Sequence, residues 1–191
     1  MTKLIYAAII SAFVNNLVLT RTFGTNSLLR DSKDYGTALR LGGGILVVTF
    51  LTSVITWPIG RYLLERFNLP ELETILFLVI EAVLIWVILA LIKKISVEKY
   101  EKLHPLFTLI IANSAVLGII LNNVNVGYSF IRSTVFSIFG AIGFGIALIL
   151  MAGVRERIRY NDVPQPFEGV PILLVTAALM AIAFYGFTGL I

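Results

Sequence analysis

Six long runs of apolar residues, separated by short polar segments, dominate the sequence. Each run approaches or reaches the roughly 20 residues that a helix needs to cross the hydrocarbon core of a bilayer. Unbroken apolar character favours helices over the strands of a membrane barrel, which would alternate apolar and polar positions. The pattern predicts an all-α integral membrane protein, one membrane domain over residues 1–191, with six transmembrane helices. The six runs are Leu4–Thr20, Leu41–Gly60, Leu72–Ile92, Pro105–Asn123, Thr134–Val154 and Val170–Leu190.

The six helices divide into two halves of three, at about residues 1–95 and 96–191. An odd number of crossings gives the halves opposite orientations, which is typical of an inverted repeat. Asparagine interrupts the first helix of each half, and glycine is concentrated in the second helix of each half. These matching positions favour two inverted three-helix repeats with broken first helices, although small residues are also common in packed membrane helices. The positions are Asn15, Asn16 and Asn113 for asparagine, and Gly42–Gly44, Gly140, Gly143 and Gly145 for glycine.

The composition supports a membrane protein and excludes several kinds of chemistry. Hydrophobic residues make up 58% and charged residues 14%, against about 45–50% and about 25% in soluble domains. The chain has no cysteine and a single histidine, His104. It therefore offers no disulfide, no thiolate nucleophile and no Cys- or multi-His-ligated metal site of its own. No catalytic residue is evident, and an ordinary soluble enzyme is excluded.

The basic residues predict how the helices are oriented. Eleven of the 15 Lys and Arg lie in the segments after the first, third and fifth runs. Because basic loops stay in the cytoplasm, both termini are expected on the periplasmic side of the inner membrane. The net charge of +4 does not indicate nucleic-acid binding, since short loops cannot form a basic face that reaches a groove. The eleven residues are Arg21, Arg30, Lys33, Arg40, Lys93, Lys94, Lys99, Lys102, Arg155, Arg157 and Arg159.

Four polar side chains near the middle of apolar runs are candidates for an ion path. Asn15, Asn16 and Asn113 would line a mid-membrane cavity if the two helices are broken there. The alternative is hydrogen bonding between helices, worth about 0.6 kcal/mol on average. Glu81 lies near the middle of the third run. A carboxyl group at that depth could carry a proton or bind a cation, or could be a protonated structural group facing another helix.

Several motifs point to a known family, and the most specific of them lie in the C-terminal part. They are Val14–Leu19, Ala112–Gly118, Arg155–Arg157, Asp162–Pro164, Pro166–Phe167, Gly169, Thr176–Met180 and Gly186–Leu190. With the length and the six-run pattern, they resemble the RnfA/NqrE family over nearly the whole chain. Members of this family are integral membrane subunits of the Rnf complex and of the sodium-pumping NADH:quinone reductase.

The resemblance implies two inverted three-helix repeats and pairing with a homologous RnfE/NqrD-type subunit of opposite topology. It also implies a two-iron, two-sulfur cluster held at mid-membrane by two cysteines from each subunit. The family's cysteine positions fall at Asn26 and Ser114. Neither residue offers the thiolate that such clusters use, so an ordinary four-cysteine cluster cannot form with this chain.

The resemblance implies a membrane subunit of an Rnf/Nqr-like electron transport complex that couples redox chemistry to translocation of Na⁺ or H⁺. Its partners would be the homologous subunit, the other subunits of the complex and the lipid bilayer. The alternative is a cluster-less relative that transports an ion or solute, including as a homo-oligomer. A third hypothesis is a purely structural assembly subunit, in which Asn16, Glu81 and Asn113 would tolerate apolar replacement.

Overall fold

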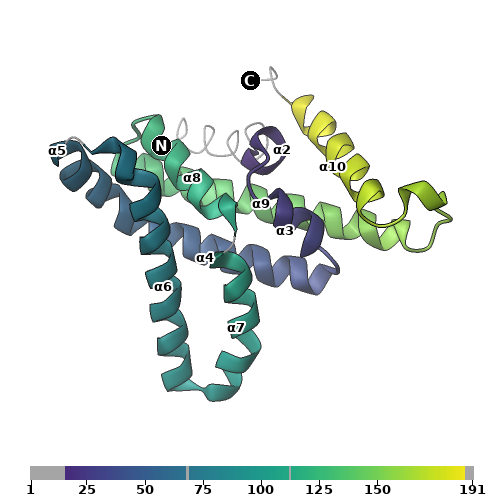
Figure 1. Cartoon of the computed structure of the whole chain (residues 1–191), viewed down its shortest axis with the longest axis horizontal. Coiled ribbons are helices and arrows are strands. Elements are labelled where there is room, and N and C mark those ends of the chain that lie inside the picture. Colours follow the sequence, from purple (N-terminus) through teal and green to yellow (C-terminus); the bar gives the residue numbers. More distant parts are fainter. Residues whose placement is uncertain (1–15, 68, 112, 188–191) are drawn as a thin grey trace.

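The computed structural model describes residues 16–67, 69–111 and 113–187, and this part of the chain contains helices and no strands. Two long helices form its centre, and the other helices pack around them (Figure 1). The helices are α2 (Leu17–Arg21), α3 (Thr25–Arg30), α4 (Tyr35–Ile59), α5 (Glu65–Phe67), α6 (Glu73–Ile95), α7 (Val97–Ile111), α8 (Ser114–Asn125), α9 (Phe130–Ile158) and α10 (Val170–Tyr185). Shorter helical turns are the π-helical segment Gly60–Leu64 and the 3₁₀ segments Pro70–Leu72 and Gln165–Phe167.

The central pair consists of α4 and α9, which lie antiparallel and in close contact (Figure 1). At one end, a Cβ atom added to Gly42 would lie only 3.2 Å from the Cα of Gly145. Toward the other end, the indole N–H of Trp57 donates to the carbonyl of Tyr128 at 2.8 Å. Small residues let two membrane helices approach in this way, and the close packing replaces contacts with lipid.

A buried polar network also joins the central helices. Ser137 on α9 donates to the hydroxyl of Ser53 on α4 at 2.9 Å. The amide of Asn123 on α8 donates to the hydroxyl of Ser137 at 2.8 Å and to the carbonyl of Ser133 at 3.1 Å. Polar groups inside a membrane protein are stable only when they find partners. The network therefore fixes how α4, α8 and α9 meet.

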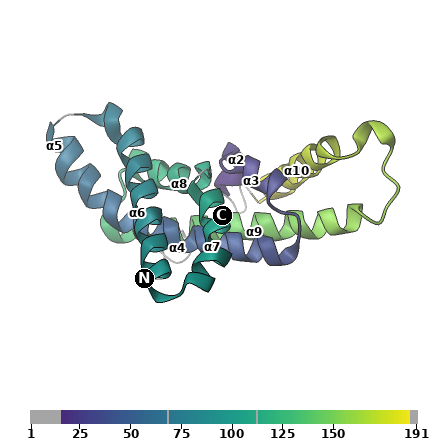
Figure 2. The ribbon, with the colours of Figure 1, turned by 60° about the horizontal axis from the view of Figure 1, so that its bottom comes forward.

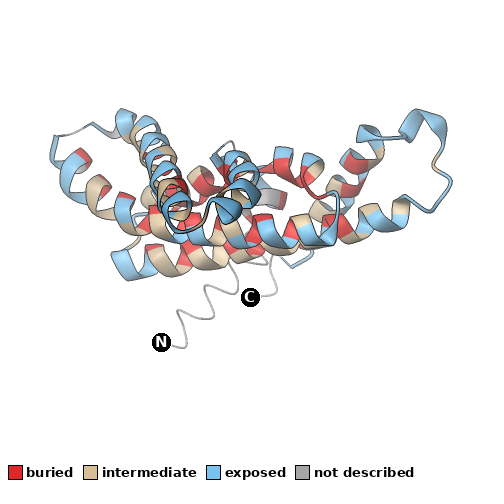
Figure 3. Ribbon diagram, turned by 90° about the horizontal axis from the view of Figure 1, so that it is seen from below, coloured by how far each residue is buried: buried red, intermediate tan, exposed pale blue. Residues whose placement is uncertain are grey.

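The helices α6 and α7 form a hairpin that stands away from the central pair (Figures 1 and 2). One side of α6 is buried at Phe77, Glu81, Ile85 and Leu89, where the helix packs on α4, α7 and α8. The other side is apolar and exposed, and Trp86 has 70% of its surface accessible. Figure 3 shows the same division, with buried positions facing the interior and exposed positions along the outer sides. An exposed apolar side is expected where a helix faces lipid or another membrane subunit.

Three helical segments of the described part are long and apolar enough to cross a membrane, namely Tyr35–Leu64, Glu73–Ile95 and Phe130–Ile158. A fourth crossing results if α7 and α8, which meet at an angle of 50°, are one bent span. The chain is thus a multi-pass membrane protein. The first predicted run, Leu4–Thr20, lies almost entirely outside the described residues. The sixth appears as α10, whose 16 residues extend about 24 Å and fall short of a bilayer core of about 30 Å.

Candidate functional site

The apolar run Pro105–Asn123 is broken at Asn113, as the sequence predicts. Asn113 has an extended backbone (φ −95°, ψ 107°), and its side-chain oxygen accepts the backbone N–H of Ala115 at 3.0 Å. Asparagine is among the best residues for such an N-cap, because it satisfies a free N–H of the first turn. The side-chain nitrogen of Asn113 is buried and has no partner among the described residues.

A second break, between α2 and α3, packs directly against the first. It contains Gly24, whose φ of +74° lies in the region that favours glycine. The N–H of Gly24 donates to the hydroxyl of Ser114 at 3.0 Å. A Cβ atom at Gly24 would lie 2.5 Å from the ring of Phe144 and 2.9 Å from the amide oxygen of Asn113. The two breaks, 90 residues apart in sequence, therefore touch each other.

The helix α9 connects these breaks to Asn16. This asparagine immediately precedes α2, is 2% exposed, and donates its amide N–H to the carbonyl of Gly143 at 2.8 Å. Phe144, the next residue, contacts the position of Gly24. The structure thus brings Asn16 and the turn at Gly24, which also contacts Asn113, to adjacent residues of one helix. Both asparagine side chains are held within packed protein, and Asn15, the third predicted asparagine, lies outside the described residues.

Asn26 and Ser114, where the sequence resemblance predicts the family's cluster cysteines, lie on either side of the same crossing. Asn26 is on α3 and Ser114 begins α8, and both are exposed. The Ser114 hydroxyl accepts a backbone N–H, and a neutral amide or hydroxyl does not replace the thiolate or imidazole that holds iron–sulfur clusters. The residues at these positions do not fit the family's two-iron, two-sulfur cluster.

Glu81 lies apart from the crossing, on the buried side of α6. The residue is 3% exposed, and one turn away on either side are the fully buried Phe77 and Ile85. One carboxyl oxygen, Oε1, is buried and has no hydrogen-bond partner in the described part of the chain. No hydrogen bond between described residues connects Glu81 with Asn16 or Asn113. An unpartnered buried carboxyl oxygen is costly and is therefore available to a proton, a cation or water.

Two features were not identified from the sequence. The network of Asn123, Ser53 and Ser137 was missed, although the two serines interrupt apolar helices and Asn123 ends an apolar run. The cationic residues Lys33, Arg155 and Arg159 were interpreted only as orientation signals, whereas the structure places all three around one cavity. Spacing along a helix could not reveal this cavity, because its residues come from segments more than 100 positions apart.

Comparison with known proteins gives consistent matches along the full chain. The profile of a family described as Rnf-Nqr subunit, membrane protein, matches residues 4–191. The RnfA subunit of an ion-translocating oxidoreductase complex from Syntrophotalea carbinolica is 40% identical over 191 residues, which is 100% of this chain and 99% of that protein. The corresponding subunit of the Na⁺-translocating ferredoxin:NAD⁺ oxidoreductase complex from Acetobacterium woodii is 41% identical over 187 residues, covering 98% and 97% of the two chains. The RnfA subunit from Vibrio vulnificus is 38% identical over the whole of both chains.

Proposed function

Because the chain belongs to the Rnf-Nqr family of membrane subunits, we propose that it carries part of the ion path of an ion-translocating oxidoreductase complex. It is the counterpart of the RnfA subunit in Rnf-type complexes. The complex couples electron transfer to the movement of Na⁺ or H⁺ across the membrane. This subunit provides part of the membrane scaffold and part of the ion path.

The ion path is inferred from one observation, the buried carboxyl oxygen of Glu81 that has no partner among the described residues. An ionisable group inside a membrane helix is rare, and its usual role is in an ion or proton pathway. The free atom of Asn113 is an N–H donor, which can hold water or a carbonyl oxygen but repels a cation. Asn16 donates an amide N–H to the carbonyl of Gly143. Glu81 is therefore the direct carrier, and Asn15, Asn16 and Asn113 shape the path around the helix breaks.

Six spans in two inverted repeats, about 1–95 and 96–191, suit this role. The second helices of the two halves are α4 and α9, and they pack against each other as an antiparallel pair. This arrangement supports equivalent positions for them in two inverted repeats. Asn16 and Asn113 each stand immediately before a short helix, as expected for equivalent positions in two broken helices. The positive-inside pattern predicts that both termini lie on the periplasmic side of the inner membrane.

The partner is a homologous RnfE/NqrD-type subunit, and the exposed apolar side of α6 supplies a surface of suitable character. The cluster positions of this chain, Asn26 and Ser114, do not fit iron–sulfur ligation. Other subunits therefore hold the redox groups. This chain's own contribution is to orient the helix breaks and to carry the ion.

Purification of the tagged chain from its native membranes in mild detergent tests this function. We expect other subunits to copurify, and the visible absorption spectrum to show flavin and iron–sulfur bands that they contribute. A colourless, self-associated protein that binds or transports an ion or solute without redox partners would contradict the proposal. It would favour the alternative of a cluster-less transporter.

A further inference from the structure

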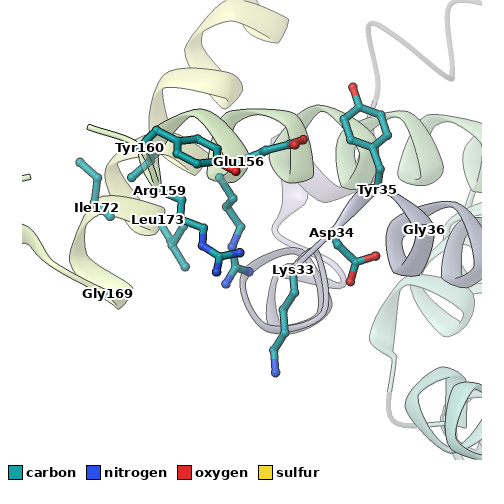
Figure 4. A pocket seen from close by; sticks show the side chains of 12 residues that line it. Lys33, Asp34, Tyr35, Gly36, Glu156, Arg159, Tyr160, Gly169, Ile172 and Leu173 are labelled. Carbon is teal, nitrogen blue, oxygen red and sulfur yellow. The ribbon is translucent and has the colours of Figure 1, made fainter. Parts of the chain in front are cut away.

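A cavity of about 630 Å³ lies where the loop before α4, the end of α9 and the start of α10 meet (Figure 4). The positively charged end of α9 marks this region as the boundary between membrane and water, because basic residues collect at that boundary. The lining includes three cations, two carboxylates, two tyrosines and three aliphatic side chains. These are Lys33, Arg155 and Arg159, Asp34 and Glu156, Tyr35 and Tyr160, and Ile158, Ile172 and Leu173.

The cations of this cavity are free to bind an anion. Within the described part of the chain, none of Lys33, Arg155 and Arg159 forms an ion pair. The guanidinium of Arg155 donates through Nη1 to the carbonyl of Leu29 at 2.8 Å and to the hydroxyl of Ser32 at 3.4 Å. These bonds fix its position and leave the N–H groups of Nε and Nη2 available. In Figure 4, the side chain of Arg159 extends into the space between α10 and the loop before α4, and the side chain of Lys33 extends from that loop at the edge of this space.

The two carboxylates in the lining keep their negative charge but form no ion pair with the three cations in the described part of the chain. Asp34 is the N-cap of α4, and its two oxygens accept the backbone N–H and the hydroxyl of Thr37, each at 2.8 Å. The backbone N–H of Thr37 holds the pKa of Asp34 below its ordinary value, so this carboxylate stays ionised and hydrogen-bonded at the start of α4. The carboxylate of Glu156 is turned toward Tyr35 in Figure 4.

An apolar surface continues from the cavity along α10. Ile172 and Leu173 form part of the cavity wall, and the exposed side chains of Leu174, Val175 and Leu179 follow on the same helix. A ligand that fills the cavity can therefore place a charged group among the cations and extend an apolar part along α10. This combination is the chemistry of a lipid with an anionic headgroup.

We propose that this cavity binds the phosphate headgroup of an anionic phospholipid. Lys33, Arg155 and Arg159 contact the phosphate through charge-assisted hydrogen bonds, Tyr160 lies at the level of the headgroup, and the acyl chains lie against α10. The bound lipid attaches α10 to the end of α9 and the loop before α4. This site does not depend on the ion path or on the redox role of the complex.

The test compares lipid retention by the purified complex carrying wild-type chain or the double variant Lys33→Gln/Arg159→Gln. After detergent washing, the complex is incubated with phosphatidylcholine vesicles that contain or lack phosphatidylglycerol, and retained lipid is measured by native mass spectrometry. The matched control is Lys94→Gln/Lys99→Gln, which removes two exposed cations from the turn between α6 and α7 on the same side of the membrane. We expect the cavity variant to lose retained phosphatidylglycerol about tenfold or more, and the control to retain it.

Equal retention by wild type and cavity variant would overturn the proposal, as would equal loss in the cavity variant and the control. Displacement of phosphatidylglycerol by inorganic phosphate alone would assign the cavity to a soluble phosphate compound and would also overturn it. The charge-preserving variant Lys33→Arg/Arg159→Lys separates loss of charge from loss of folding. It should bind the lipid, and its failure to bind while remaining folded would contradict recognition by charge.

Discussion

Gly24 shows how a single residue determines the crossing of the two helix breaks. Its positive φ lets the chain turn between α2 and α3, and its missing side chain leaves room for Phe144 and Asn113. The same close approach brings its N–H to the hydroxyl of Ser114. Backbone conformation and packing therefore both require glycine at this position.

A comparison of Gly24→Ala with Gly127→Ala separates the effect of backbone strain on stability from the effect of overpacking. Gly127 has a similar φ of +70°, but a Cβ atom there would have no neighbour within 4 Å. Gly127→Ala should lower the free energy of unfolding by about 1 kcal/mol through backbone strain alone. Gly24→Ala should lower it by about 2–5 kcal/mol, because overpacking adds to the strain. Unfolding in mixed micelles measures both values, and equal effects would contradict the tight crossing.

For individual residues, the sequence predicted part of the site. An amide in the middle of an apolar run predicted the break at Asn113, because asparagine favours capping over a continuous helix. The contact between Gly24 and Ser114 could not be predicted, since 90 residues separate them and no local pattern encodes the distance. Glu81 was identified by its polarity, and the structure adds that one of its oxygens lacks a partner among the described residues.

In α4, three consecutive glycines have different surroundings. Gly42 faces α9, where it approaches Gly145, and Gly44 faces Ile110 of α7, whose terminal methyl group would have to move to admit a Cβ atom. Gly43 between them is exposed, with nothing within 4 Å of its added Cβ. The sequence predicted close packing by this helix. It could not assign a partner to each glycine, because α4 is apolar on all sides.

A large side chain at Gly42 should separate α4 from α9, whereas the same side chain at Gly43 should be tolerated. We expect Gly42→Leu to lower the free energy of unfolding by about 3 kcal/mol through overpacking. Gly43→Leu should change it by about 0.5 kcal/mol or less, because the position is exposed. The measurement is unfolding of each variant in the same detergent. Equal destabilisation by the two variants would contradict the close packing of α4 against α9 at Gly42.

For the whole molecule, hydropathy gave the class and most of the helices, but it did not settle the number of spans. The runs at Leu41–Gly60, Leu72–Ile92 and Thr134–Val154 correspond to α4, α6 and α9, each longer than its apolar run. The helices continue into polar residues such as Arg155 and Arg157, which apolar runs exclude. Gly169 and Gly186 flank α10 and mark its two ends. Hydropathy does not detect these ends.

The absence of cysteine makes the proposed topology directly measurable. Single cysteines at Arg66, Lys94, Asn125 and Arg157 occupy exposed positions and can be labelled without background from the rest of the chain. A membrane-impermeant thiol reagent added outside intact cells should label the cysteines at positions 66 and 125. It should label those at 94 and 157 only after the cells are opened. A cysteine appended after Ile191 should react from outside, and protection of that cysteine would rule out a sixth crossing by α10.

Ion uptake by membrane vesicles that contain the Glu81→Gln variant is the most direct test of an ion path through this subunit. Glutamine keeps the size and a hydrogen-bonding group of Glu81 but cannot carry a charge or bind a cation as a carboxylate. The matched control is Glu101→Gln, at an exposed position of α7. We predict that redox-driven uptake of Na⁺ or H⁺ falls about tenfold or more in Glu81→Gln, while the amount of assembled complex and the control's uptake stay at the wild-type level. Undiminished uptake, or a loss that only parallels a loss of assembled complex, would contradict an ion path through Glu81.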